Sequence, residues 1–216
     1  RNALIRRLPS VETLGSTTVI CTDKTGTLTA NQVTVKKLYV NGKIIDATGV
    51  GYEAKGSFLY KNKPVRPEEI ELLLRIGILN NNSEIKEGKV IGDPTEAALI
   101  VSAAKLGLIK EDFDIEYRRI DEIEFTSERK MMTTIHGHHG ENISYVKGAP
   151  EVVLKLCNYI YLNGEIKKLT ANMKEEITEA NRQFAEGALR VLGFAYKTIV
   201  DSNPEKNLIF VGLQGM

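Results

Sequence analysis

Short segments in which apolar and polar residues alternate run through most of the chain, and turn residues separate them. This period of two predicts antiparallel strands joined by hairpins. Asn41-Gly42 and Asn163-Gly164 are strong hairpin turns, because both residue types tolerate positive φ angles. Residues 46–66 are rich in glycine, lysine and turn formers and predict an irregular loop. The predicted strands span residues 33–40, 43–45, 115–125, 131–135, 143–146, 159–162, 165–168, 190–196 and 208–213.

Four other segments carry apolar residues at helical spacing. Pro67 and Pro150 suit the first position of a helix, Asp93 and Thr170 are N-cap residues, and Glu96 takes the capping-box position three residues after Asp93. The predicted helices cover residues 67–78, 94–106, 150–156 and 170–188. Helices interleaved with hairpins favour an antiparallel sheet flanked by helices, which is an α/β (α+β) fold.

The run of residues 17–29 does not fit this antiparallel pattern. Its apolar segment, residues 19–21, predicts a buried strand that ends at Asp23 and belongs to a parallel sheet. Ligands and reacting groups lie at strand ends in such sheets, so the Asp23 carboxylate would point into a crevice beside the positive charge of Lys24. Gly26 would let the backbone turn tightly and approach a phosphate. A carboxylate in this position can attack a phosphoryl group and form an aspartyl-phosphate.

Composition narrows the possible functions. Hydrophobic residues make up 42% of the 216 positions, enough for one large domain or for one domain and a fragment. Lysine and arginine number 29 and aspartate and glutamate 28, so no global field attracts nucleic acid and any anion site must be local. Cys21 and Cys157 lie far apart, which favours a reduced compartment. No apolar stretch is long enough to span a bilayer, and a chain that does not begin with Met is expected to be part of a longer protein.

The stretch from Asp23 to Thr29, Asp-Lys-Thr-Gly-Thr-Leu-Thr, resembles the phosphorylation motif of the P-type cation-transporting ATPases. The resemblance implies that Asp23, with Lys24 and Thr25 beside it, accepts the γ-phosphoryl group of ATP. It also implies a Mg²⁺ ion held by the Asp23 carboxylate and the Thr25 backbone carbonyl. Phosphatases of the related haloacid-dehalogenase fold carry a second aspartate where this chain has Thr25. Without that base, water should attack the acyl-phosphate slowly, as a pump requires.

Two further stretches resemble the adenine end of the family's nucleotide site. In Gly92–Leu99 the resemblance implies that Glu96 accepts a hydrogen bond from the adenine amino group, although a capping box alone would also explain this glutamate. In the stretch Phe125–Lys130, it implies that Phe125 stacks on adenine and that Lys130 lies near the nucleotide. Phe125 could instead be an ordinary core residue, and Arg129 could replace Lys130.

Two more stretches resemble the remaining part of that site. The resemblance of Lys147–Glu151 implies that Lys147 borders the nucleotide and that Gly148 lets it approach the backbone. Arg190 matches a family arginine that contacts the ATP phosphates through its planar fork. The alternatives are a surface lysine in a strand-to-helix turn and an arginine with a structural role.

The histidines His136, His138 and His139 lie in the predicted loop at residues 136–140. They have no nearby cysteine and no paired carboxylates at ligand spacing, which argues against a metal site. We expect them to be exposed to solvent.

The resemblance is greatest to the calcium-pump-like branch of the family, and the sodium/potassium and proton pumps stay open as alternatives. It divides the chain into residues 1–30, a connector and the first strand of a haloacid-dehalogenase-like phosphorylation domain, residues 31–213, a nucleotide-binding domain, and residues 214–216, the start of a return hinge. The implied parent is an integral membrane protein that hydrolyses ATP and transports a cation, with this part at the cytoplasmic face. The partners would be the remaining phosphorylation domain, an actuator domain and transmembrane helices of the same polypeptide.

The chain alone should bind ATP weakly and should not turn over. The alternatives from the sequence are a stand-alone, non-catalytic nucleotide-binding module and a haloacid-dehalogenase-type phosphatase that uses Asp23.

Overall fold

A computed structural model describes residues 15–19, 21–22, 32–86, 89–200 and 203–216. The chain separates into two compact units, residues 1–31 and residues 32–216, and each is described by itself. In the first unit, Asp23, Lys24 and Thr25 lie outside the described residues. The strand predicted over residues 17–22 is not formed at residues 17–19 and 21–22, and Val19 is 72% exposed. A strand forms only beside another strand, and none of the described residues of this unit is in a strand.

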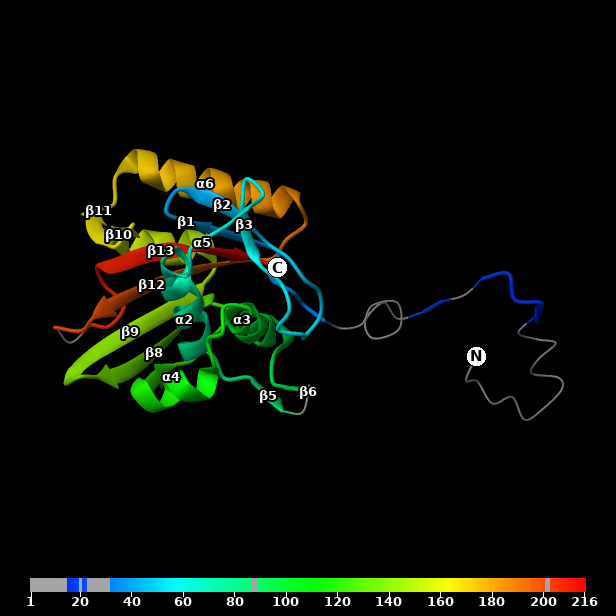
Figure 1. The fold of residues 1–216 in the computed structure, drawn as a ribbon, viewed down its shortest axis with the longest axis horizontal. Helices are drawn as coiled ribbons and strands as arrows, with labels where there is room; N and C mark the ends of the chain where they lie inside the picture. Colours follow the sequence, from blue (N-terminus) through cyan, green and yellow to red (C-terminus); the bar gives the residue numbers. More distant parts are fainter. Residues whose placement is uncertain (1–14, 20, 23–31, 87–88, 201–202) are drawn as a thin grey trace. The chain divides into compact units, whose positions relative to one another are not determined.

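The second unit is built on one large, mostly antiparallel sheet (Figure 1). Its strands are β1 (Lys37–Val40), β2 (Lys43–Ala47), β3 (Phe58–Tyr60), β4 (Lys63–Pro64), β7 (Arg118–Ile123), β8 (Met131–His138), β9 (Glu141–Gly148), β10 (Cys157–Leu162), β11 (Glu165–Lys168), β12 (Val191–Thr198) and β13 (Leu208–Gly215). The order is β4-β3-β2-β1-β13-β12-β9-β8-β7, and the β10–β11 hairpin joins through β10, which pairs with β13 in parallel. The predicted antiparallel sheet flanked by helices is confirmed.

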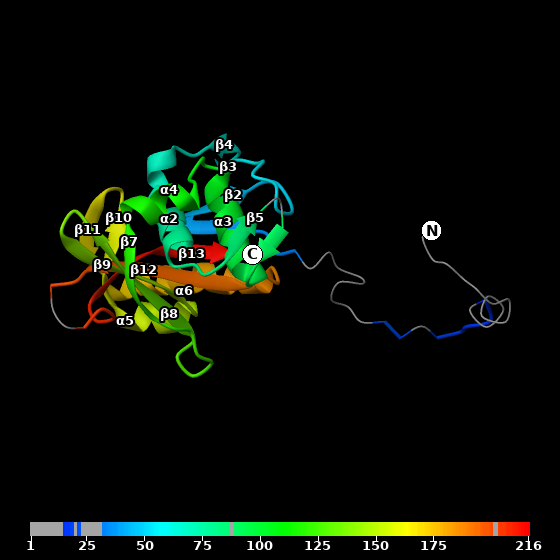
Figure 2. The same cartoon turned by 90° about the horizontal axis from the view of Figure 1, so that it is seen from below.

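Helices cover both faces of this sheet. They are α2 (Glu71–Leu79), α3 (Pro94–Ala104), α4 (Lys110–Glu116), α5 (Pro150–Leu156) and α6 (Ala171–Glu186), and a short 3-10 helix, η2 (Pro67–Glu69), precedes α2. Helices α5 and α6 lie on one face and α2, α3 and α4 on the other (Figure 2). Each face buries its own hydrophobic cluster, one around Leu73 and Phe194 and the other around Phe184 and Phe210. Both faces of the sheet are therefore covered by helices and carry a hydrophobic core.

Turn chemistry explains why the hairpins form where the sequence predicts them. Asn41 and Gly42 have φ angles of 53° and 70°, and Asn163 and Gly164 have φ angles of 50° and 91°. Both pairs thus take the positive φ values that a two-residue hairpin needs. The Thr170 side chain accepts a hydrogen bond from the Met173 backbone N–H and caps α6 as predicted.

Three predicted segments differ from the structure. The irregular loop predicted at 46–66 contains the β3–β4 hairpin, because Lys61 and Asn62 adopt positive φ angles without a glycine. The strand predicted at 115–125 begins as α4 and becomes β7 only at Arg118. Residues 84–86 and 89–91 form a separate two-stranded sheet, β5 (Glu84–Lys86) and β6 (Lys89–Ile91), which the sequence pattern did not indicate.

The last strand is longer than predicted. β13 continues through Gly215, so residues 214 and 215 pair with β1 and β12 within the sheet. The backbone N–H of Met216 then donates a hydrogen bond to the carbonyl of Arg190 at 2.9 Å. Among the described residues, no helix combines the length and apolar character that crossing a membrane requires.

Candidate functional site

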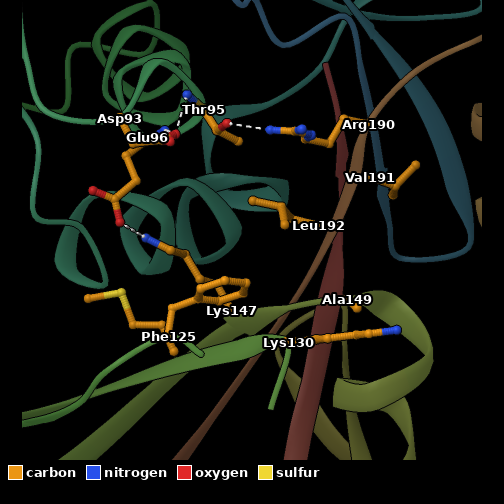
Figure 3. Close-up of a pocket in the computed structure, with 11 residues that line it drawn as sticks. Asp93, Thr95, Glu96, Phe125, Lys130, Lys147, Ala149, Arg190, Val191 and Leu192 are labelled. Carbon is orange, nitrogen blue, oxygen red and sulfur yellow. Dashed lines mark hydrogen bonds and ion pairs between the residues drawn. The ribbon is translucent and has the colours of Figure 1, made fainter. Parts of the chain in front are cut away.

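A pocket of about 570 Å³ opens where the N-terminus of α3 faces the ends of β8, β9 and β12 (Figure 3). This volume suits a small-molecule ligand. The pocket is lined by Asp93, Thr95, Glu96, Phe125, Lys130, Met132, Lys147, Ala149, Arg190, Val191 and Leu192. It brings together five of the six residues that the sequence assigns to a nucleotide site, from segments far apart in the chain.

Asp93 fixes the start of α3. Its Oδ1 atom accepts hydrogen bonds from the backbone N–H groups of Thr95 at 2.7 Å and Glu96 at 3.3 Å, and Pro94 follows at the first helical position. Although desolvation raises the pKa of Asp93, these hydrogen bonds hold it below its ordinary value of 3.8. The cap thus fixes the backbone of Thr95 and Glu96, both of which line the pocket.

Replacing Asp93 with alanine should lower the free energy of unfolding by about 1 kcal/mol, as for other lost N-caps. Asp93→Asn should keep most of the stabilisation by the cap, because the amide oxygen still accepts both hydrogen bonds. The pKa of Asp93 is lowered in the folded state, so its stabilising contribution is present above pH 3.8 and is lost as the pH falls through the folded-state pKa. Urea denaturation at neutral pH and near pH 3 would measure this. An Asn variant as unstable as the Ala variant would contradict it.

The Glu96 carboxylate does not complete a capping box with Asp93. Its Oε1 atom accepts a hydrogen bond from Lys147 Nζ at 2.5 Å, and its Oε2 atom accepts from the Asn82 backbone N–H at 2.9 Å and from Ser83 Oγ at 3.2 Å. The glutamate is therefore turned toward the pocket wall, and a capping box alone does not explain it.

Lys147 is held in a nearly closed environment. Its side chain is 9% exposed and the Glu96 side chain 15%. Besides Glu96, the Lys147 ammonium donates to the carbonyl oxygen of Asn80 at 2.5 Å, and the Asn80 side chain in turn donates to the carbonyls of Met132 and Tyr145. Burial lowers the pKa of Lys147, while the Glu96 carboxylate opposes that effect. The alternative of a surface lysine in a turn is excluded.

Phe125 follows the end of β7 and is 59% exposed. It lines the pocket on the same side as Glu96 and Lys147 (Figure 3). A large aromatic ring so exposed is not a core residue, which excludes the structural alternative. Its free face offers a platform for another planar group.

Arg190 and Lys130 supply positive charge to the pocket. Arg190 Nη1 donates a hydrogen bond to Thr95 Oγ1 at 3.0 Å, so the guanidinium lies beside the N-terminus of α3. Lys130 is exposed and lines the pocket, with its backbone at a φ of 54°. Arg129, the alternative to Lys130, instead forms an ion pair with Glu205. The geometry therefore favours Lys130 as the pocket cation.

The packing of the sheet explains why residue 148 is a glycine. A Cβ atom at Gly148 would lie 2.5 Å from the Lys130 carbonyl oxygen and 2.5 Å from the Met131 Cβ atom. The close approach of β8 and β9 thus requires a glycine, and Gly148 is not among the residues that line the pocket. Its contact with a ligand stays a prediction.

Several lining residues carry no motif that would reveal them in the sequence. These are Met132, Val191 and Leu192, which supply apolar surface, whereas Thr95, which accepts a hydrogen bond from Arg190, lies within the Gly92–Leu99 stretch. Helix N-cap chemistry points to the α3 terminus, but nothing local indicates which apolar strand residues face a cavity rather than the core.

The predicted exposure of the histidine segment is wrong for His136. This side chain is fully buried within β8, and its Nδ1 atom lies 2.8 Å from the Tyr117 carbonyl oxygen. The turn consists of His139 and Gly140 alone, with φ angles of 48° and 83°. The strands therefore extend further than the apolar pattern indicates, because the polar residues His136 and His138 are still paired in the sheet.

The fold and the pocket together define an α/β domain with a cavity large enough for a small molecule, and comparison with known proteins specifies it further. The family described as "P-type ATPase, cytoplasmic domain N" matches residues 69–216. Calcium-transporting ATPase 1 of Lactococcus lactis is 39% identical over 100% of this chain and 24% of its own length. The cation-transporting ATPase pma1 of Synechocystis is 41% identical over 100% of this chain and 26% of its own length. The calcium-transporting ATPase of Bacillus subtilis is 38% identical over 100% of this chain and 26% of its own length.

The chain belongs to the P-type ATPase family, and its matched part is the cytoplasmic domain N. It spans about a quarter of the length of the curated relatives it matches. The resemblance drawn from the Asp23 motif and the pocket motifs is thereby confirmed at the level of the family.

Proposed function

We propose that the pocket binds ATP and that residues 31–213 form the nucleotide-binding domain of a P-type ATPase. The observation that carries this proposal is the exposed Phe125 ring in one cavity with Glu96, Lys147, Lys130 and Arg190. An aromatic face, a hydrogen-bond acceptor and several cations are the chemistry that an adenine ring joined to a polyphosphate needs.

The hydrogen bonds of Glu96 support its role toward adenine. A carboxylate oxygen can accept about two hydrogen bonds. Oε2 already accepts two, from Asn82 and Ser83, whereas Oε1 accepts one, from Lys147. Oε1 therefore has capacity for one more donor, and the adenine amino group is such a donor. Phe125 would stack on the ring, and Lys130 and Arg190 would hold the phosphates.

For the whole protein we propose ATP-driven cation transport, with Ca²⁺ as the cation, through an aspartyl-phosphate at Asp23. The names of the Lactococcus and Bacillus relatives support calcium. Asp23, with Lys24 and Thr25, lies outside the described residues, so the support for this step is the sequence motif. Mg²⁺, when bound by Asp23 and Thr25, would neutralise phosphate charge.

The coverage of the relatives supports the remaining parts of the proposal. Because the chain matches about a quarter of each relative, we propose that a phosphorylation domain, an actuator domain and transmembrane helices complete the protein. The parent would then lie in a membrane with this domain at the cytoplasmic face. By itself, the chain should bind ATP without hydrolysing it.

An ATP titration of the 216-residue chain without Mg²⁺, followed by amide NMR shifts, tests nucleotide binding. We expect the shifts to cluster at Glu96, Phe125, Lys130, Lys147, Gly148 and Arg190. Adenosine alone should move the amides around Phe125 and Glu96, and tripolyphosphate alone those around Lys130 and Arg190. Shifts confined to amides outside the pocket would overturn the assignment.

A further inference from the structure

A second group of chemically active side chains lies far from the pocket. His138 ends β8, six residues after the pocket residue Met132, which corresponds to about 20 Å along a strand. His139 follows in the turn to β9, and Glu116 ends α4, which packs beside this end of the sheet. The proposed nucleotide site uses none of these three residues.

The three side chains converge on one point. One ligand atom from each of Glu116, His138 and His139 lies within 4.8 Å of the other two. The rings of His138 and His139 have their centroids 4.0 Å apart. Glu116 and His139 are exposed, and His138 is partly buried, so the point is open to ions from solvent. Ligand atoms around a four-coordinate Zn²⁺ lie roughly 3–3.5 Å apart, given metal–ligand bonds of about 2.1 Å, so small side-chain rotations would close the site.

The His138 ring is held in one orientation. It stacks on Tyr117 with a centroid distance of 4.0 Å and an interplanar angle of 14°. Its Nδ1 atom lies 3.4 Å from the backbone carbonyl oxygen of Glu116, and its Nε2 atom lies 3.8 Å from Glu116 Oε1. With the proton on Nδ1 donated to that carbonyl, the Nε2 lone pair faces the carboxylate. A backbone carbonyl behind the ring is the usual support of a metal-binding histidine.

The surrounding charges permit a cation here. Arg118 and Arg119 line the same hollow as the histidines. Arg119, however, is paired with the Glu122 carboxylate at 2.8 Å, which offsets its charge. Glu141 also lines the hollow and stands directly across the hairpin from His138, so it adds a negative charge beside the ring.

We propose that Glu116, His138 and His139 bind a divalent transition-metal ion of the Zn²⁺ type. Two imidazole nitrogens and one carboxylate oxygen are ligands that zinc prefers, and water would complete the coordination. The ion would join the C-terminus of α4 to the β8–β9 turn. The sequence argued against a metal because it offered no nearby cysteine and no paired carboxylates at ligand spacing, whereas the fold supplies Glu116 from 22 residues before His138.

Titration of the 216-residue chain, free of any histidine tag, with ZnCl₂ by isothermal calorimetry tests this site. We expect one site, weakened at least about tenfold in His139→Asn and in Glu116→Gln, since even the loss of an outer-shell partner costs 10–100-fold. Asparagine is chosen for position 139 because it tolerates the positive φ angle of His139. Glu128→Gln, which removes an exposed carboxylate elsewhere, is the matched control and should bind zinc like the parent.

Two further measurements separate metal binding from effects on folding. Zinc should raise the Tm of the parent and of Glu128→Gln, and at the same zinc concentration it should raise that of His139→Asn clearly less. Co²⁺ should give d–d absorption bands with the parent that the His139→Asn variant lacks. Zinc binding of equal strength in the parent and in both site variants, or no saturable binding in the parent, would overturn the proposal.

Discussion

Replacing Lys147 with methionine should lower the free energy of unfolding by about 3–5 kcal/mol, the usual cost of removing one partner from a buried ion pair. Methionine keeps much of the apolar stem, so the loss comes from the missing charge. The Glu96 carboxylate, 15% exposed, would then keep only Asn82 and Ser83 as partners, and the Asn80 carbonyl would lose its donor. Because Glu96 retains those two hydrogen bonds, we expect the lower end of this range. Urea denaturation of the parent and variant chains measures the effect.

The double variant Glu96→Gln/Lys147→Met is the matched control for this prediction. It removes both charges, so it should be more stable than the sum of the two single changes predicts. Equal stability of Lys147→Met and the parent would contradict the pairing that the structure shows. A fully additive double variant would indicate that the two side chains do not interact.

Replacing Phe125 with alanine should weaken ATP binding by about 1–3 kcal/mol, roughly 5- to 150-fold in Kd, which is the range for the loss of base stacking on an aromatic ring. The stability should change little, because the side chain is 59% exposed and packs against little else. Calorimetric titration with ATP, beside urea denaturation, measures both quantities.

Two variants control the Phe125 prediction. Phe125→Tyr keeps the ring and should bind ATP nearly as the parent does. Tyr159→Ala removes an aromatic ring that is 43% exposed on β10 and does not line the pocket, so it should leave ATP affinity unchanged. If Phe125→Ala binds ATP like the parent, the ring is not the stacking platform and the adenine must lie elsewhere in the cavity.

Much of the fold could be predicted because its signals are local. A turn at Asn41-Gly42 or a cap at Asp93 depends on a few neighbouring residues, which are visible in the sequence. The β3–β4 hairpin was missed because Lys61 adopts a positive φ angle that lysine seldom takes. Helix α4 was missed because its start carries no helix-initiating residue: Ile109 precedes it without a side-chain cap, whereas the equally short α5 begins at Pro150.

The candidate site could be predicted only as a set of motifs. Their residue types indicated an aromatic ring, an acceptor and cations, and all but Gly148 line one pocket. The sequence could not choose between Arg129 and Lys130, since that choice depends on Glu205, which lies 76 residues from Arg129 and takes it as an ion-pair partner. It also could not show that β8 and β9 approach too closely at Gly148 for any side chain.

By itself, the sequence determined the family, the alternation of hairpins and helices, and the kinds of side chain available for binding. The tertiary structure alone decided which of them meet. It turns Glu96 from its cap toward Lys147, 51 residues away, and it brings Glu116 to the histidines of the β8–β9 hairpin. The physical reason is the separation along the chain of the residues that interact. Turns and caps are set by backbone preferences over a few residues, whereas these encounters depend on how strands pair and helices pack across the whole sheet.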